Sequence, residues 1–332
     1  LNENGLAELT RDLRSSSDIS VPPVFLTYTL DFTDPIMEDI FRDQGGFDIV
    51  ANFSAHKHVR SEKDKYSVEA LLKNNVIKAK WLLDLLKVYK PKHFFCVSTD
   101  KAANPVNVMG ASKRVMEDLI MSYKPDFKVT TARFANVAFS NGSLPASFFD
   151  RMMKNQPLVA PRDVKRYFVS MEESGQICML ACILGNNGEI FFSKLGKEKM
   201  KTFSEICDAF LVESGYKKHE CGSDEEAKQF AAENLPGDTY PVVYFDSDTT
   251  GEKDEEEFYV GGEETDMDRF RALGVITHTQ NKQREEVDAL IHTLESMFHK
   301  RDFTKADVVA CLEGYLPNFQ HEEKGKNLDD KM

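Results

Sequence analysis

The sequence lacks the features that mark disulfide-rich, zinc-binding and membrane-spanning proteins. Its 332 residues include only six cysteines, and no two of them form a Cys-x-x-Cys pair. Such sparse, irregularly spaced cysteines indicate free thiols in a reducing cytoplasm, and no metal site is predicted. The longest apolar stretches, such as residues 177–184, are far shorter than the roughly 20 residues that span a bilayer, so no integral membrane segment is expected.

Positive charge is also scarce. The chain has 42 lysine and arginine residues against 55 acidic residues, a net charge of −13, and it has no lysine-rich arm. A general nucleic-acid partner is therefore not expected. Hydrophobic residues make up 41% of the chain, which suffices at this length for a large core without a disulfide or metal.

A glycine-rich dinucleotide turn is missing as well. No Gly-x-Gly-x-x-Gly occurs in the sequence, although that turn normally lets a cofactor pyrophosphate approach a helix N-terminus. The chain opens instead with an amphipathic helix predicted over residues 4–14. We therefore expect the natural chain to begin earlier, with a β-strand, a glycine-rich turn and a helix before Leu1.

The first half of the chain alternates strand-like and helix-like segments. Apolar, β-branched runs predict strands, and apolar residues at i, i+3 and i+4 predict helices. Strands are predicted at 24–28, 47–53, 93–98 and 128–134, and helices at 35–41, 66–89 and 108–123. This order predicts an α/β fold with a doubly wound parallel sheet. After about residue 142, a strand at 190–192 and helices at 203–214 and 224–233 predict a smaller α/β region.

The domain organisation follows from this change. Residues 1–140 are expected to form a Rossmann-like cofactor domain that is incomplete at its N-terminus. Residues 141–320 are expected to be mainly a substrate-binding and C-terminal region, with some segments returning to the first domain. The charged runs at 252–257 and 321–332 have no apolar face, which predicts solvated surface.

The stretch that carries chemistry follows the third predicted strand. It reads Ser98-Thr99-Asp100-Lys101, and the next helix carries Lys113. Open α/β sheets bind ligands at the carboxyl ends of their strands. An adjacent acid and amine at such an end are suited to paired proton transfers. A surface Asp–Lys pair in a loop is the alternative that the spacing leaves open.

These residues resemble the signature of a known family. Residues 98–114 (STDKAANPVNVMGASKR) are similar to the sugar-nucleotide branch of the extended short-chain dehydrogenases/reductases. The similarity is to the polysaccharide-biosynthesis group that contains UDP-N-acetylglucosamine 4,6-dehydratases. Further motifs of that group are resembled at 52–64, 132–143, 165–168 and, as a fragment, 251–253. The resemblance implies a modified Rossmann fold.

The resemblance also implies an internal redox dehydration of UDP-N-acetylglucosamine, with tightly bound NAD or NADP regenerated in each turnover. Hydride leaves C4, water is lost across C5 and C6, and hydride returns to C6. Asp100 would protonate the departing C6 hydroxyl, Lys101 would remove the C5 proton, and Thr99 would hydrogen-bond the C4 hydroxyl. We expect burial or a nearby cation such as Lys113 to lower the pKa of Lys101, so that its amine is neutral.

One departure concerns the base for C4 oxidation. Met109 stands where the family's Tyr-x-x-x-Lys motif has its tyrosine. A thioether cannot take a proton, so Met109 cannot be this base. Asp100, Thr99 or a bound water remains available. Some members of the resembled branch also carry methionine here, so the change does not by itself imply inactivity.

The resemblance implies a set of cofactor-binding residues. Lys113 would hold the nicotinamide ribose, and Asp31 would accept a hydrogen bond from adenine unless it serves as a helix cap. Residues 53–55 would pass beneath the nicotinamide-side ribose. The complete implied set is Asp31, Phe32, Phe53, Ser54, Ala55, Asn75, Val97, Ser98, Lys113 and Val137.

The implied substrate-binding residues lie in three other segments. Small residues in one loop would let backbone N–H groups approach an anion, and a nearby arginine would add a cation for the diphosphate or uracil. The complete implied set is Lys57, Asn136, Ser140, Gly142, Ser143 and Arg166. The family's usual arginine before Gly251 is replaced by residues 248–250 (DTT), so the diphosphate clamp comes from elsewhere or the substrate differs. No metal is expected at His56 and His58.

Two other functions remain open. A UDP-hexose epimerase on the same scaffold would not need the Asp100–Lys101 pair, and a non-catalytic nucleotide-binding protein would bind cofactor without turnover. The resemblance also implies a homo-oligomer. The apolar helices predicted at 66–89 and 108–123 are suited to pairing with symmetry mates.

Overall fold

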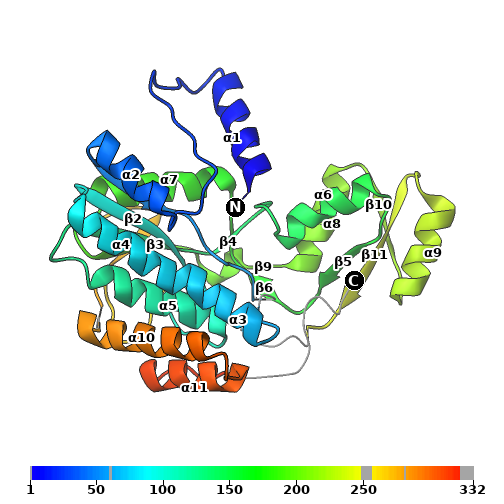
Figure 1. Cartoon of the computed structure of the whole chain (residues 1–332). Helices are drawn as coiled ribbons and strands as arrows, with labels where there is room; N and C mark the ends of the chain where they lie inside the picture. The colour runs from blue at the N-terminus through cyan, green and yellow to red at the C-terminus, as the bar shows by residue number, and fades with distance from the viewer. Residues whose placement is uncertain (1, 60–61, 248–255, 280–281, 322–332) are drawn as a thin grey trace.

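The computed structural model describes residues 2–59, 62–247, 256–279 and 282–321 (Figure 1). The motif fragment at 251–253, the three residues before it, and residues 322–332 of the charged tail lie outside the described residues.

A six-stranded sheet forms the centre of the larger part of the molecule. Its strands lie in the order β1 (Ile49–Asn52), β2 (His93–Thr99), β3 (Lys128–Phe134), β8 (Glu189–Ser193), β13 (Leu273–His278) and β12 (Glu264–Asp266). The first four strands run parallel, and β13 and β12 are antiparallel to their neighbours. The predicted strands at 47–53, 93–98, 128–134 and 190–192 are thereby confirmed.

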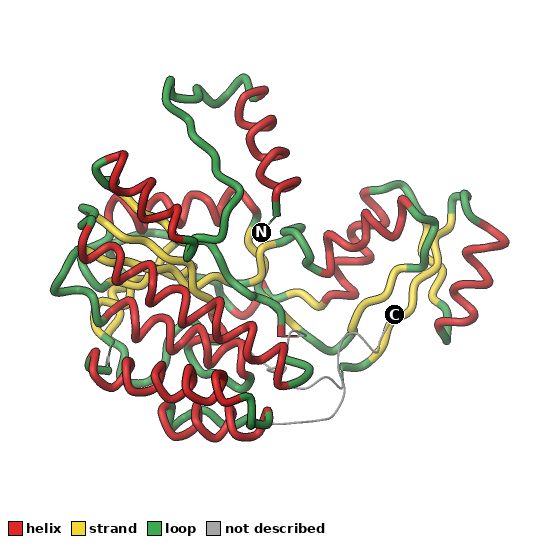
Figure 2. Tube along the Cα trace, in the orientation of Figure 1, coloured by secondary structure: helices red, strands yellow, loops and turns green. Residues whose placement is uncertain are grey.

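Helices cover both faces of this sheet (Figures 1 and 2). One face packs against α3 (Lys65–Leu72), α4 (Lys78–Val88), α5 (Val108–Met121), α10 (Arg284–Lys300) and α11 (Lys305–Tyr315). The other face packs against α7 (Met171–Leu184). Side chains along β2 point to alternate faces of the sheet. Phe94 and Cys96 therefore pack in the core with the first group of helices, whereas Phe95 packs in the core with α7. The doubly wound α/β prediction is confirmed.

A smaller region lies beside the larger part of the molecule (Figures 1 and 2). Its parallel three-stranded sheet has the order β10 (Lys217–Glu220), β11 (Thr239–Phe245) and β5 (Leu158–Pro161). Its helices are α6 (Leu144–Met153), α8 (Phe203–Glu213) and α9 (Asp224–Asn234). Two short pairs, β4 (Asn136–Val137) with β7 (Phe168–Val169) and β6 (Lys165–Arg166) with β9 (Lys201–Thr202), lie between the two regions. The division of the chain at residue 140 stays a prediction.

Residues 24–28 are not a strand, and this sequence prediction is wrong. They run as a loop between α1 (Glu3–Ser15) and α2 (Pro35–Gln44), with Val24, Leu26 and Tyr28 exposed. A strand needs a neighbouring ladder for its backbone groups. Within the described residues the main sheet ends at β1, and residues 24–28 do not pair with it or with another strand.

The C-terminal helices α10 and α11 pack against α3, α4 and α5, the helices that the sequence predicts to pair with a symmetry mate. Leu290 and Leu294 of α10 and Leu312 of α11 are buried in the same core as Leu86 of α4 and Leu119 of α5. The apolar surface on which the oligomer expectation rested is therefore buried within the chain. The expectation of a homo-oligomer itself stays a prediction.

None of the described helices is both long enough and apolar enough to cross a membrane.

Candidate active site

Thr99, Asp100 and Lys101 lie where β2 leaves the sheet. The strand ends at Thr99, and a 3-10 turn (Asp100–Ala102) leads toward the N-terminus of α5. Thr99 Oγ1 donates to Asp100 Oδ1 at 2.7 Å, and Lys101 Nζ donates to the same oxygen at 3.1 Å. Asp100 is only 2% exposed, so the two residues do not form an ordinary surface pair.

A second carboxylate, Glu256, completes this cluster. Its side chain is hydrogen-bonded to that of Asp100. Its Oε1 lies 3.6 Å from Lys101 Nζ and 3.4 Å from Arg166 Nε. Glu256 is 8% exposed, so the prediction of solvated surface for residues 252–257 is wrong at this position. The reason is that Glu256 pairs with two cations, which the composition of the run does not reveal.

Neighbouring groups fix the Glu256 carboxylate further. Asn136 Nδ2 donates to Oε1 at 2.8 Å, and the Tyr167 backbone N–H donates to Oε2 at 3.0 Å. Asn136 and Arg166, which are predicted to bind substrate, thus lie beside Asp100 and Lys101, which are predicted to be catalytic. Glu256 contacts both pairs, and the sequence analysis does not select it.

The cluster shifts the titration of each member. Burial and the charge of Asp100 raise the pKa of Glu256 to about 7, against the opposing effect of Lys101 and Arg166. Burial alone would lower the pKa of Lys101, but the carboxylates of Asp100 and Glu256 outweigh it and raise that pKa. Burial would raise the pKa of Asp100, but Lys101 and the hydrogen bonds from its neighbours lower it.

The expectation of a lowered pKa for Lys101 is therefore wrong. Two carboxylates face the ammonium, and they stabilise its charge more than burial destabilises it. The nearby Lys113 differs from Lys101, because burial lowers its pKa.

Lys113 lies on α5, four residues after the buried Met109. Its Nζ donates to the Val97 carbonyl at 3.1 Å and contacts Met116 Sδ at 3.7 Å. An ammonium has three N–H donors, so within the described residues Lys113 has donor capacity left for a hydroxyl group such as that of a ribose. These residues therefore fit the nicotinamide end of a dinucleotide.

Asn75 fixes the loop that the resemblance places beside the cofactor. It lies in a π-helical segment (Lys73–Ile77) between α3 and α4. Its Oδ1 accepts from the His56 N–H at 2.8 Å, and its Nδ2 donates to the His56 carbonyl and to Ser112 Oγ, both at 3.0 Å. These bonds use its polar atoms on the protein, so Asn75 orders the loop that contains Ser54 and Ala55.

Asp31 is held by the protein rather than capping a helix. Its carboxylate accepts from the Thr33 N–H at 3.0 Å and forms an ion pair with Lys78. Burial would raise the pKa of Asp31, but the bonds from Lys78 and Thr33 lower it to about 2. Asp34 caps α2 itself, since its side chain accepts from the Ile36 N–H. Phe32 packs against the edge of the main core.

The predicted substrate loops meet across the site. Lys57 Nζ donates to Ser140 Oγ at 3.4 Å, and burial lowers the pKa of Lys57. Gly142 has a φ of +75°, and a Cβ there would come within 2.9 Å of His58 Nε2. Ser143 caps the N-terminus of α6. The loop therefore places Lys57 beside the start of a helix, an arrangement that favours an anion.

Three cofactor predictions have other observed contacts. Ser98 Oγ donates to the buried Glu117 at 2.5 Å, Val137 pairs with Val169 in the β4–β7 ladder, and Phe53 is exposed with its ring 5.9 Å from that of Phe95. Val97 offers its carbonyl to Lys113.

A buried ion network behind β2 was also missed. Arg133 is fully buried and donates to Glu117 at 2.8 Å and to Glu263 at 2.7 Å. Burial would lower the pKa of Arg133, but these carboxylates raise it. The three residues are far apart in sequence, so no local sequence pattern predicts that they form a network. The network ties α5 and β3 to the segment that contains Glu256.

Comparisons with known proteins agree with this fold. Over 88% of the chain, the structure superimposes on 87% of the protein Pen of Bacillus thuringiensis, with a TM-score of 0.64 at 18% identity. It also superimposes on UDP-glucuronic acid 4-epimerase of Bacillus cereus, a structure solved with UDP-glucuronic acid and NAD, with a TM-score of 0.55 at 15% identity over 76% of each chain. The chain thus shares its doubly wound α/β fold with these two proteins.

Sequence comparison is more specific. The family model described as polysaccharide biosynthesis protein matches residues 3–231. The chain therefore belongs to the polysaccharide biosynthesis protein family.

Curated relatives share part of their length with the chain. An uncharacterized membrane protein of Methanocaldococcus jannaschii is 33% identical over 51% of this chain and 53% of its own length. The UDP-N-acetylglucosamine 4,6-dehydratase (inverting) of Campylobacter jejuni is 27% identical over 60% of this chain and 64% of its own. A UDP-glucose 4-epimerase of Rickettsia bellii is 30% identical over 45% of each. The matches thus span about half to two thirds of these relatives.

Proposed function

We propose that the protein is a nicotinamide-dependent sugar-nucleotide 4,6-dehydratase that acts on UDP-N-acetylglucosamine. The observation that carries this proposal is the buried cluster of Asp100, Lys101 and Glu256 at the carboxyl end of β2. Elimination of water across C5 and C6 needs a base that removes the C5 proton and an acid that protonates the hydroxyl group on C6. Similarity to the Campylobacter dehydratase supports this reaction and substrate.

The protonation states of Asp100, Lys101 and Glu256 are suited to an elimination. Near neutral pH, Lys101 is an ammonium, Asp100 is a carboxylate, and Glu256 holds a proton for part of the time because its pKa is about 7. When Glu256 passes its proton to Asp100 and receives one from Lys101, the result is a neutral amine and two neutral carboxyl groups. The total number of protons is unchanged.

These protonation states match the roles implied by the resemblance. The neutral Lys101 amine takes the C5 proton, and the Asp100 carboxyl gives its proton to the departing C6 hydroxyl, which leaves as water. Lys101 is then an ammonium and Asp100 a carboxylate, as in the resting state. Glu256 thus acts as a proton store that makes the acid and the base available together.

NAD or NADP, held by Lys113 and the loop at 53–55, would supply the hydride acceptor and donor for this chemistry. Thr99 uses its proton in the bond to Asp100, so its oxygen is left to accept from the C4 hydroxyl. When Glu256 starts ionised, the proton of that hydroxyl passes through Thr99 to Asp100 in place of the Glu256 proton, while Glu256 takes the proton of Lys101. Lys101 returns its proton to C5 when hydride reaches C6 and then regains one from Glu256, so the proton count closes over the turnover. Lys57 and the start of α6 offer a positive site for the diphosphate.

The test is incubation of the full-length protein with UDP-N-acetylglucosamine and NAD in ²H₂O, followed by mass spectrometry and NMR. The dehydratase proposal expects loss of one water and deuterium at C5. Lys101→Met is expected to abolish both, and Lys87→Met, an exposed lysine of α4, serves as the matched control.

The same experiment addresses a UDP-hexose 4-epimerase, which similarity to the Rickettsia epimerase favours. A product of unchanged mass with inverted C4, formed equally well by Lys101→Met, would establish epimerisation and refute dehydration. Cofactor binding without turnover of any UDP-hexose would indicate a non-catalytic nucleotide-binding protein.

A further inference from the structure

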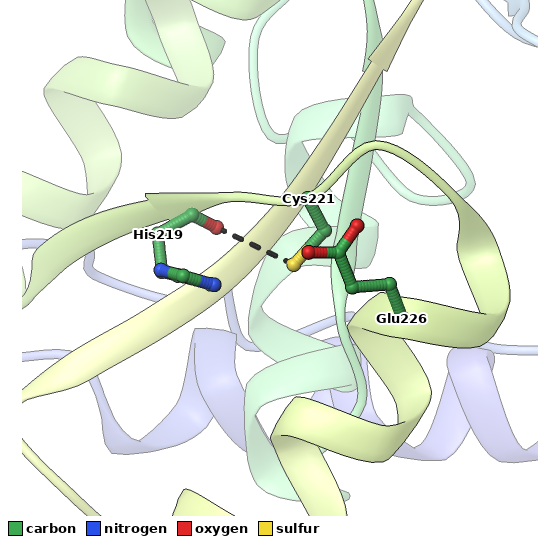
Figure 3. Close-up of side chains that lie close together, drawn as sticks. All are labelled: His219, Cys221 and Glu226. Carbon is green, nitrogen blue, oxygen red and sulfur yellow. Dashed lines mark hydrogen bonds between the residues drawn. The ribbon is translucent and has the colours of Figure 1, made fainter.

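A second chemical cluster lies in the smaller region, outside the candidate active site. His219, Cys221 and Glu226 each direct one ligand-type atom into a common space, and these atoms lie within 4.8 Å of one another (Figure 3). β10 and α9, which carry the cluster, form the end of the molecule opposite α10 and α11 (Figure 1).

The local fold explains the convergence. His219 belongs to β10 and Cys221 follows two residues later, so both side chains point to one side of the extended backbone. Glu226 lies in the first turn of α9, which begins directly after this strand. The strand-to-helix connection therefore brings a nitrogen, a sulfur and an oxygen ligand together from eight consecutive residues.

Surrounding contacts fix each of the three groups. The Phe230 ring stacks on the His219 ring with centroids 4.1 Å apart. The Gly222 N–H donates to Glu226 Oε2 at 2.7 Å, which leaves Oε1 to bind another group. Cys221 is buried in a small core with Val243 of β11 and Val159 of β5.

The cluster lacks a cation of its own. Within the described part of the chain, Glu226 has no lysine or arginine partner. The thiol of Cys221 has only a weak bond to the His219 carbonyl, 3.8 Å from its sulfur. A thiolate and a carboxylate together carry two negative charges, which match a divalent cation.

We propose that His219, Cys221 and Glu226 bind one divalent cation of the zinc class. Imidazole, thiolate and carboxylate are the three ligand types that Zn²⁺ takes in proteins, whereas Mg²⁺ and Ca²⁺ prefer oxygen ligands alone. Ligand atoms around tetrahedral zinc lie about 3.5 Å apart, since each is about 2.0–2.3 Å from the metal. The exposed Glu226 side chain can move the short distance this requires.

Three protein ligands leave the fourth position to water or another small ligand. The bound ion would fasten β10 to the first turn of α9. Cysteine binds a metal as the thiolate, so formation of the sulfur–metal bond releases the thiol proton to solvent, and the affinity is expected to fall as the pH is lowered.

Titration of the metal-free full chain with Co²⁺ tests the proposal directly. Tetrahedral Co²⁺ gives visible ligand-field bands, and a thiolate ligand adds a charge-transfer band in the near ultraviolet. We expect both bands to saturate at one Co²⁺ per chain, to disappear on addition of one Zn²⁺, and to persist in excess Mg²⁺. Absence of a thiolate band, or a band that Mg²⁺ removes, would overturn the proposal.

Matched variants assign the bands to this cluster. Cys221→Ser is expected to abolish the thiolate band, whereas Cys311→Ser, a partly buried thiol of α11, is expected to keep it. Glu226→Gln is expected to weaken Co²⁺ binding more than about tenfold. Loss of a residue that only hydrogen-bonds to a metal ligand already weakens metal binding by about tenfold or more. Glu225→Gln, an exposed acid in the same helical turn, is expected to leave the affinity unchanged.

The two exposed glutamates keep the test decisive if Cys221→Ser fails to fold, because neither supports the core. Equal affinities for the Glu226→Gln and Glu225→Gln variants would show that the metal is bound elsewhere. That outcome would refute the proposal whether or not the protein is a dehydratase.

Discussion

Replacement of Glu256 by glutamine tests the proton store through folding stability. In the folded protein the pKa of Glu256 is raised from 4.5 to about 7. Below pH 4.5 the group is protonated in both the folded and unfolded chains, and it has no differential effect. As the pH rises through the interval, the unfolded chain loses this proton first, so the folded state is progressively destabilised.

The size of this effect follows from the same two values. The difference is about 2.5 pKa units, and each unit corresponds to about 1.4 kcal/mol, so the contribution of Glu256 to wild-type stability falls by on the order of 3 kcal/mol between pH 4.5 and 8. Glutamine stays neutral throughout. The stability of Glu256→Gln relative to wild type is therefore expected to increase by this amount across the interval, whatever constant offset its altered hydrogen bonds add.

Urea unfolding at several pH values measures this difference, with the single tryptophan, Trp81, and far-ultraviolet circular dichroism as probes. The exposed neighbour provides the control, and Glu257→Gln is expected to follow the wild-type pH dependence. If Glu256→Gln lost stability with rising pH as steeply as the wild type, Glu256 would not hold a proton near neutrality. The proposed proton store would then be refuted.

Four further substitutions follow from the site and its supports. Lys101→Met is expected to abolish C5 proton exchange with solvent while leaving cofactor affinity in equilibrium dialysis nearly intact, and retained turnover would contradict its role. Lys113→Met is expected to weaken the cofactor complex in the same dialysis, because it removes the buried donor beside Val97. Asn75→Ala should cost about 2 kcal/mol of unfolding free energy, since it removes a buried amide and leaves the part-buried N–H and C=O groups of His56 without this partner. Tyr315→Phe should cost about 1 kcal/mol and raise the pKa of Asp118 above its value of about 6, as NMR titration of that carboxyl would show.

Local pattern sufficed to predict the elements that form the main sheet. The β-branched run at 128–134 became β3 with the same bounds, and the helix predicted at 108–123 became α5. Both segments are buried on nearly every side, so their apolar content and their structure depend on the same packing. The run at 24–28 has similar residues but no neighbouring strand, and strand formation depends on that non-local partner.

The candidate site also contains residues that local sequence predicts and residues that only the tertiary structure brings together. Asp100 and Lys101 are predicted because they follow a strong strand signal and because residues 98–114 resemble a family signature; their spacing alone leaves a surface pair open. Glu256 was not found, because it lies in an acidic run whose composition is typical of exposed surface, and only the tertiary fold pairs it with Lys101 and Arg166. A sequence pattern records neighbours along the chain, whereas the raised pKa of Glu256 arises from neighbours in space.

The C-terminal segment has a role that follows from where it packs. Glu62 Oε2 accepts from the Val108 N–H at 2.7 Å, at the first turn of α5, and Lys305 Nζ donates to the Glu62 carbonyl at 3.1 Å. His321 also bonds to the Glu62 carboxylate, so this first residue of the predicted solvated tail is largely buried instead. Because α5 carries Lys113 and begins just after the Asp100–Lys101 turn, contacts that hold its N-terminus also hold the candidate site. The described part of the C-terminal segment thus supports the position of the candidate site, although it contributes no residue to the cluster of Asp100, Lys101 and Glu256.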